Sequence, residues 1–130
     1  MALPIKNGKV TVPFGKAGPR WSTGAHTGVD FAVPVGTPVL AVVDGTIVNA
    51  NWGKAYGNQV IQKVAGGYVI YAHLNKVRIK PGMVVKKGQL VGESGNSGTN
   101  TTGAHLHLEL RDNIRWSNGK AKDPKDLLKA

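Results

Sequence analysis

Residues 104–110 (AHLHLEL) alternate strictly between apolar and polar side chains, and no other feature of the chain constrains its fold as strongly. In an extended chain, successive side chains point to opposite faces, and neighbours on one face have Cα atoms about 7 Å apart. The leucines therefore share one face, and the other face carries three polar side chains: His105, His107 and Glu109. We predict a strand whose leucines enter the core while both imidazoles project into a cleft. The alternative is a strand whose outer face merely carries polar residues.

Short apolar segments separated by glycine and proline continue through the middle of the chain. Two hairpins are predicted there, with turns at residues 44–45 (DG) and 65–67 (AGG). Their strands are residues 39–43, 46–50, 60–64 and 68–71.

Helix signals are scarce, and the best of them lies at the end of the chain. Asp123 can cap a helix, Pro124 suits the first helical position, and residues 125–129 can extend it by a turn or two. The sequence therefore predicts a mainly β fold, a compact antiparallel sheet or sandwich with a short C-terminal helix.

Length and composition bound the organisation of the chain. Its 130 residues are most simply one domain, residues 1–130, which is long enough to bury a single core. Cysteine is absent, which excludes disulfides and thiolate metal sites. No apolar run approaches the roughly 20 residues of a membrane-spanning helix, and residues 1–6 do not resemble a signal peptide. We expect a protein that leaves the cell by another route, or a domain excised from a longer chain.

A formal net charge of +10 favours anionic partners. Nucleic acid and anionic cell-wall polymers both fit, and a surface that only aids solubility is the third interpretation. The chain has no helix-turn-helix pattern, zinc-finger spacing or aromatic RNA-binding signature. A basic nucleic-acid-binding β domain would also leave the histidines unexplained.

All four histidines lie in settings that suit a metal site. His26 precedes Asp30 by four residues, and in an extended strand their Cα atoms would lie about 13 Å apart, too far to share an ion. Gly28 between them permits a bend that brings the pair together. A lone His-x-x-x-Asp pattern is weak evidence. Together with the downstream His-x-His pair and His73 it becomes strong.

A ligand set can then be counted. His26, Asp30 and one histidine of the His-x-His pair supply two nitrogens and one carboxylate oxygen. Three protein ligands leave a position open for water, which is typical of catalytic zinc. A single carboxylate leaves the centre positively charged, so the ion acidifies that water and polarises a bound carbonyl. Co²⁺ and Mn²⁺ also suit these donors, and the pattern alone does not decide which histidine of the pair binds the metal.

The same segments resemble the motifs of a known enzyme family. Residues 24–39 look like the first metal motif of the lysostaphin-type zinc endopeptidases, and residues 71–74 (YAHL) resemble that family's middle histidine segment. Residues 94–98 (SGNSG) and 103–109 (GAHLHLE) match its last motif. The resemblance runs in the family's order from about residue 12 to residue 110, which is most of the chain.

This resemblance implies ligands, catalytic roles and a fold. It implies one catalytic Zn²⁺ held by His26, Asp30 and His107. His105 would take a proton from the attacking water, and His73 would stabilise the transition state or assist proton transfer. The implied fold is a small antiparallel β domain with the substrate groove across its sheet.

The resemblance also implies a substrate, because family members hydrolyse peptide bonds in the stem peptide or cross-bridge of bacterial peptidoglycan. We expect a zinc metalloendopeptidase that acts at the cell wall, with no nucleic-acid or membrane partner, and we expect a monomer. A phage or prophage endolysin released through a membrane pore and the excised domain of a secreted hydrolase both fit. The alternative is a non-catalytic wall-binding or regulatory module of the same fold. Such a module is expected to lose metal or base residues, which this chain keeps.

Two features stay open. Glu109 shares the face of the two strand histidines. It could orient a metal-binding histidine without contacting the ion, but we do not assign it a catalytic role. Residues 94–103 are rich in glycine, asparagine, serine and threonine, which suits either the lining of a substrate groove or an ordinary surface loop.

Overall fold

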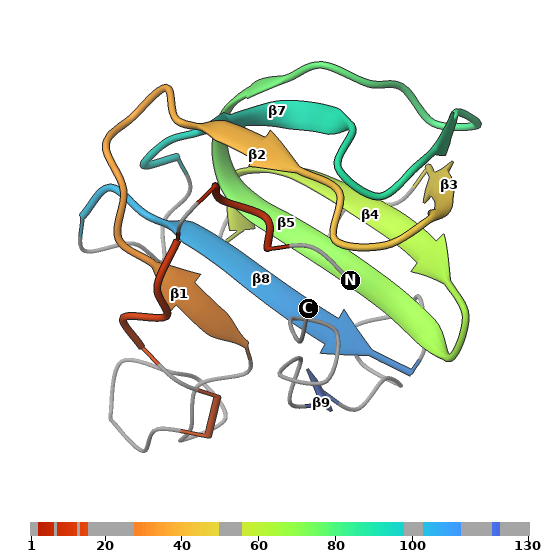
Figure 1. Ribbon diagram of the computed structural model, residues 1–130, viewed down its shortest axis with the longest axis horizontal. Coiled ribbons are helices and arrows are strands. Elements are labelled where there is room, and N and C mark those ends of the chain that lie inside the picture. The colour runs from red at the N-terminus through yellow and green to blue at the C-terminus, as the bar shows by residue number, and fades with distance from the viewer. Residues whose placement is uncertain are drawn as a thin grey trace.

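The computed structural model describes residues 3–6, 8–12, 14–15, 28–49, 56–97, 103–112 and 121–122. Every named element within these ranges is a β-strand (Figure 1). The strands are β1 (Val29–Phe31), β2 (Pro38–Leu40), β3 (Gly45–Val48), β4 (Asn58–Val64), β5 (Gly67–Val77), β6 (Val84–Val85), β7 (Leu90–Ser94), β8 (Leu106–Arg111) and β9 (Ala121–Lys122). The prediction of a mainly β, antiparallel fold is therefore confirmed.

The longest strand, β5, lies at the centre of the sheet. The order across the sheet is β1-β8-β5-β4-β3-β6, and each of these pairings is antiparallel. β2 pairs with β7, which also joins β5, and β9 pairs with the end of β8. In Figure 1, β2 and β7 lie side by side above the long diagonal of β5 and β8.

β5 changes partners along its length. Its first half pairs with β8 from Tyr68 to Ala72, and its second half pairs with β7 from Leu74 to Val77. His73 lies between these two stretches with a φ of 62°, the left-handed region that few residues other than glycine adopt. The sheet therefore forks at His73, with β7 on one branch and β8 on the other.

One predicted hairpin is confirmed and the other is wrong. β4 and β5 form the second hairpin, and Gly66 supplies the positive φ of 88° that its tight turn requires. The first hairpin does not form, because β2 pairs with β7 while β3 pairs with β4 and β6. Ala41 is bonded instead to the turn before β7, through Gln89 and Gly88. Long-range partners thus override the local turn signal of residues 44–45.

The two faces of β8 have different surroundings. Leu106 and Leu108 are fully buried in the main hydrophobic core, together with residues of β2, β5 and β7. Across the sheet, a smaller apolar cluster of Ile61, Ile70 and Ala72 lies on the face that carries the polar side chains of β8. The alternation of residues 104–110 therefore divides core from site, as the sequence predicts.

A buried polar contact ties the main core together. The Tyr71 hydroxyl donates to Oε1 of Gln62 at 2.7 Å and accepts from the main-chain N–H of Val42 at 3.1 Å. The side-chain amide of Gln62 in turn donates to the Val43 carbonyl at 2.7 Å. Burial, opposed by the Val42 hydrogen bond, raises the pKa of Tyr71 well above its ordinary value. These bonds fasten the segment after β2 to the central strands.

The predicted C-terminal helix, residues 123–129, lies outside the described residues. No helix in the described part of the chain is long and apolar enough to cross a membrane.

Candidate active site

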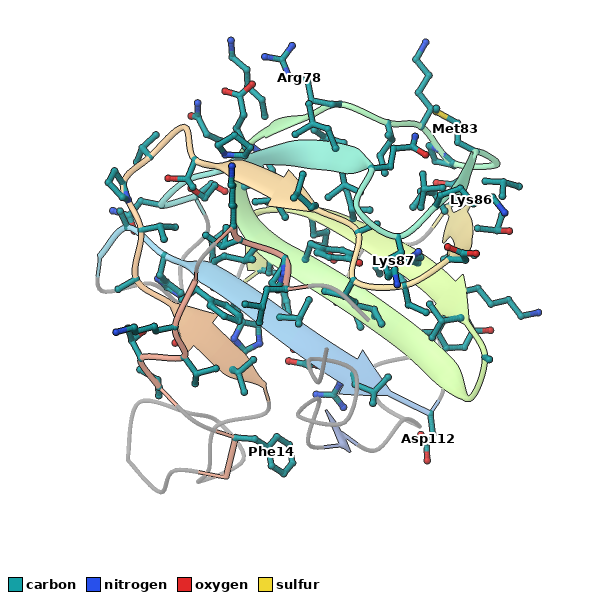
Figure 2. All side chains as sticks on the ribbon, in the orientation of Figure 1. Phe14, Arg78, Met83, Lys86, Lys87 and Asp112 are labelled. Atoms are coloured by element: carbon teal, nitrogen blue, oxygen red, sulfur yellow. The ribbon has the colours of Figure 1, made fainter. Side chains whose placement is uncertain are left out.

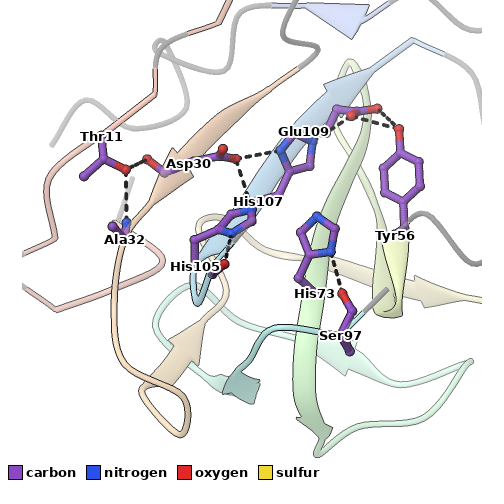
Figure 3. A network of polar contacts seen from close by, with 10 residues as sticks. Thr11, Asp30, Ala32, Tyr56, His73, Ser97, His105, His107 and Glu109 are labelled. Atoms are coloured by element: carbon purple, nitrogen blue, oxygen red, sulfur yellow. Dashed lines mark hydrogen bonds and ion pairs between the residues drawn. The ribbon is translucent and has the colours of Figure 1, made fainter. Parts of the chain in front are cut away.

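Asp30 and His107 meet at the junction of β1 and β8. They are directly opposite in the strand register, and Nδ1 of His107 donates to Oδ1 of Asp30 at 2.8 Å. Both residues are buried, with exposed fractions of 8% and 7%. On the outer side of β1, Thr11 and Val12 hydrogen-bond to the main chain of Asp30, and Figure 3 shows the contact of the Thr11 side chain. Asp30 is thus held from both sides of its strand.

Gly28 lets β1 approach β8 closely at this point. A Cβ atom on Gly28 would lie 2.2 Å from the Leu108 carbonyl oxygen and 2.9 Å from Cε1 of His107. Any side chain would therefore displace either the strand or the His107 ring. The bend that the sequence predicts between residues 26 and 30 falls partly outside the described residues. The structure gives Gly28 a second, steric role.

His107 is flanked by two carboxylates. Its Nδ1 faces Asp30, and its Nε2 donates to Oε1 of Glu109 at 2.9 Å. Burial opposes a charge on the ring, but the hydrogen bonds to Asp30 and Glu109 outweigh it and raise the pKa of His107 to about 9. His107 and Asp30 are therefore joined by a hydrogen bond between a protonated imidazole and a carboxylate.

His105 lies beside this pair. Its Nδ1 donates to the Gly103 carbonyl at 2.7 Å, and its Nε2 is 3.8 Å from Oδ1 of Asp30. Its main chain is bridged to Gly95, which extends the β7 branch toward the start of β8. His105 therefore reaches the site from the point where the two branches of the sheet come together again.

His73 completes the cluster from the fork in β5. Its Nδ1 donates to the Ser97 carbonyl at 2.7 Å, and its ring centroid lies 4.8 Å from that of His105 and 6.0 Å from that of His107. Burial lowers the pKa of His73 to about 4, although the bond to Ser97 acts in the opposite direction. His73 is therefore a neutral imidazole at pH 7.

The hydrogen-bond partners define the tautomers of the two flanking histidines. A carbonyl oxygen can only accept, so Nδ1 carries the hydrogen in both His73 and His105. In the neutral form of either ring, the lone pair is then on Nε2. In His105 this nitrogen is the one nearest Asp30. Both rings thus lie beside the buried contact between Asp30 and His107.

Ser97 is fixed by a second set of contacts that the sequence did not reveal. Its hydroxyl donates to the Leu74 carbonyl at 2.6 Å and accepts from the main-chain N–H of Asn58 at 3.1 Å. Gly57, with a φ of 64°, makes room, since a Cβ there would lie 2.5 Å from the Ser97 carbonyl carbon. The beginning of the 94–103 segment thus supports His73, and residues 98–102 lie outside the described residues.

Four of the five predicted site residues are brought together: Asp30, His73, His105 and His107. The fifth, His26, lies outside the described residues. Within the described part of the chain, no group of three or more such side chains is arranged to hold a metal ion. Asp30 and His107 nevertheless present one oxygen and one nitrogen to a common point, which are donors that zinc accepts. These two residues fit two positions of a three-ligand site.

Comparison with known proteins assigns the chain to a family. The model of peptidase family M23 matches residues 24–124. The glycyl-glycine endopeptidase ALE-1 of Staphylococcus capitis is 44% identical over 110 residues, 82% of this chain and 30% of that protein. The peptidoglycan DD-endopeptidase ShyA of Vibrio cholerae is 44% identical over 86 residues, 65% of this chain and 20% of that protein. The chain thus spans less than a third of these relatives.

Solved structures agree with the sequence comparison. The catalytic domain of the antimicrobial peptidase lysostaphin from Staphylococcus simulans superposes with a TM-score of 0.84 at 36% identity, covering 96% of this chain and 95% of that domain. A zinc-containing peptidase from Vibrio cholerae superposes with a TM-score of 0.76 at 30% identity, over 98% of this chain and 39% of that one. On sequence and fold together, the chain belongs to peptidase family M23.

Proposed function

We propose that this protein is a zinc-dependent endopeptidase that hydrolyses peptide bonds in bacterial peptidoglycan. One observation carries the proposal: two imidazoles, those of His73 and His105, lie beside the buried contact between Asp30 and His107. The names of the relatives support the substrate, since ShyA is a peptidoglycan endopeptidase and ALE-1 a glycyl-glycine endopeptidase. The zinc-containing structural relative supports the metal.

The proposed ligands are His26, Asp30 and His107. When bound there, a zinc ion supplies a Lewis acid that lowers the pKa of water and polarises the scissile carbonyl. Asp30 and His107 are held by strand pairing and by burial, so they need little rearrangement to bind an ion. Asp30 and His107, now joined by a hydrogen bond, would each supply one atom to the ion.

His105 is the proposed general base. With its hydrogen on Nδ1, its Nε2 can accept a proton from the attacking water and later pass it to the leaving amine. His73 has the same tautomer, so its Nε2 is an acceptor and not a donor. This favours a role for His73 in proton transfer over direct donation to the developing oxyanion. His73 stabilises that charge only after it has received a proton.

The decisive experiment is mass spectrometry of fragments released from purified peptidoglycans of different cross-link types, with and without a chelator. We expect new peptide termini that disappear with the chelator and return with Zn²⁺. The termini also identify the bond that is cleaved, in the stem peptide or the cross-bridge. Binding to every wall type without new termini would overturn the proposed enzymatic activity. The remaining interpretation would be a non-catalytic wall-binding module of the same fold.

We also propose that the basic surface draws the protein to anionic wall polymers. The described cations at the end of β5 and in the following connection are exposed: Lys76, Arg78, Lys80, Lys86 and Lys87. Figure 2 shows Arg78, Met83 and Lys86 along the rim of the molecule opposite Phe14. Attraction of this kind is screened beyond about 10 Å at 0.1 M salt, so wall binding should weaken as salt rises. Wall binding that does not change with salt would exclude this electrostatic attraction.

The place of action follows from the substrate. We propose that residues 1–130 form one domain that works at the bacterial cell wall as a monomer, and the match over the catalytic domain of lysostaphin supports the single domain within this chain. Whether it is a phage endolysin or part of a secreted hydrolase stays a prediction.

A further inference from the structure

Glu109 is a fully buried carboxylate directly behind His107. Its Oε1 accepts from Nε2 of His107 at 2.9 Å, and the Tyr56 hydroxyl lies 3.0 Å from Oε1 and 3.2 Å from Oε2. Oε2 also accepts from Nε of Arg111, itself only 4% exposed. Figure 3 shows the carboxylate between the His107 ring and the Tyr56 hydroxyl. Three donors, two from β8 and one from the residue two places before β4, therefore converge on one acidic side chain.

Such an arrangement is costly unless every charge is satisfied. A carboxylate removed from water loses far more hydration than an apolar side chain, and a paired cation and hydrogen bonds only offset that loss. An apolar residue at position 109 would extend the neighbouring cluster of Ile61, Ile70 and Ala72 at no such cost. Packing alone therefore does not account for a glutamate there.

The contact of Glu109 with His107 has a specific chemical effect. Glu109 accepts from Nε2 while Nδ1 points toward Asp30, so an ion that replaced the Nδ1 hydrogen would leave the remaining hydrogen of His107 on Nε2. An imidazole that binds a metal needs the hydrogen on its far nitrogen and a fixed ring plane. The two carboxylates beside His107 thus have different tasks, since Asp30 faces the metal position and Glu109 faces away from it.

We propose that Glu109 is a positioning residue that fixes the tautomer and ring orientation of His107, and that Tyr56 and Arg111 hold its carboxylate in place. The proposal rests on the proposed metal site and adds to it three residues that do not bind the ion. Tyr56 also packs the edge of its ring against His107, with centroids 6.1 Å apart and planes at 68°. It immediately precedes the Gly57–Asn58 segment that supports Ser97, so one short stretch of chain braces both sides of the histidine cluster.

The test is zinc affinity, measured by competition with a chromophoric chelator on the purified chain. Glu109→Gln keeps the shape of the side chain but replaces the charged acceptor with a neutral amide. We expect about 10- to 100-fold weaker zinc binding, the usual consequence of losing a partner behind a metal-bound histidine. Tyr56→Phe removes one hydroxyl and should weaken binding by a smaller factor. In the double variant, the effect of Tyr56→Phe should largely disappear, because Tyr56 acts through Glu109.

Tyr71→Phe is the matched control. It also removes a hydroxyl with two hydrogen bonds, but on the opposite face of β5, within the main core. We expect it to lower the stability to denaturant without changing zinc affinity. Nitrogen chemical shifts of the His107 ring provide a second readout, and they should report hydrogen on Nε2 in the zinc-loaded wild type and a mixture of tautomers in Glu109→Gln.

The outcomes separate this proposal from the proposed function. Folded Tyr56→Phe and Glu109→Gln proteins that bind zinc as tightly as the wild type would overturn the positioning role, as would equal weakening by Tyr71→Phe. If the wild type binds zinc and the variants bind it weakly while none cleaves peptidoglycan, the positioning role stands and the proposed activity fails. A wild type that binds no zinc would overturn both.

Discussion

His73 and His105 reach the site from different strands, yet each donates its Nδ1 hydrogen to a main-chain carbonyl, and their ring centroids lie only 4.8 Å apart. At this separation a proton on one ring lowers the proton affinity of the other. His73, whose pKa is lowered to about 4, is therefore neutral at pH 7. The matching contacts leave Nε2 as the nitrogen that can accept a proton in the neutral form of either ring, as the proposed proton transfer requires.

His105→Ala should keep zinc and lose turnover. The proposed ligand atoms belong to other residues, so we expect zinc content by atomic absorption to stay at the wild-type level. Removal of a general base typically costs between 10² and 10⁴ in rate, and fragment release should fall by that order. A variant that loses zinc along with activity would instead make His105 a ligand.

His73 should remain neutral well below the usual range of histidine. Its folded-state pKa of about 4 lies below the ordinary value of 6.5, so between these values the unfolded chain binds a proton that the folded chain does not. This contribution to stability is fully present above pH 6.5 and is lost as the pH falls toward 4. NMR titration should show ring signals of His73 that do not shift above pH 5.5.

The comparison with His73→Asn isolates this effect in denaturant unfolding, because asparagine tolerates the left-handed backbone of this position. The stability advantage of the wild type over the variant should shrink as the pH falls from 6.5 to 4. An advantage that is independent of pH would contradict the lowered pKa.

Gly28→Ala should destabilise the junction of β1 and β8. The added methyl group would overlap the Leu108 carbonyl and the His107 ring, and overpacking of this kind costs about 1–3 kcal/mol. Denaturant unfolding measures the loss, and zinc affinity should fall as well. Gly103→Ala is the control, since a Cβ at Gly103 has no neighbour within 4 Å. Equal losses for the two variants would exclude a steric role for Gly28.

Ser97→Ala should loosen His73. The substitution removes one donated and one accepted hydrogen bond, which corresponds to about 1–2 kcal/mol of stability. Ser94→Ala removes a similar pair, with Pro34 and Thr37, away from the histidines. We expect comparable stability losses, but only Ser97→Ala should lower kcat and shift the His73 ring signals. Equal changes in kcat would mean that Ser97 has only a structural role.

The strand character of β8 and the grouping of its histidines could be predicted because both depend on local alternation. The proximity of His107 and Asp30 could also be predicted, because it requires only that the two motifs lie on paired strands. The partner of β2 could not be predicted, because it is chosen by contacts across the core that overrule a strong turn dipeptide.

Tyr56 and the Ser97 carbonyl gave no signal in the sequence. Tyr56 is 53 residues from Glu109, and a main-chain carbonyl has no residue type to recognise. Arg111 could have been found from the sequence, because it extends the apolar–polar alternation of residues 104–110 by one polar position. The polar face of the strand therefore contained more of the site than the histidines alone indicated.

The fork of β5 at His73 divides the chain into parts that can change independently. The side chains of the site come from β1, β8 and the fork itself, whereas the 78–89 connection leaves from the far end of β5 and is anchored by β6 and β7. Exchange or lengthening of that connection alters the outer surface and its charge while the histidine cluster keeps its supports. For protein engineering, the boundary between the outer basic surface and the histidine cluster therefore falls within a single strand.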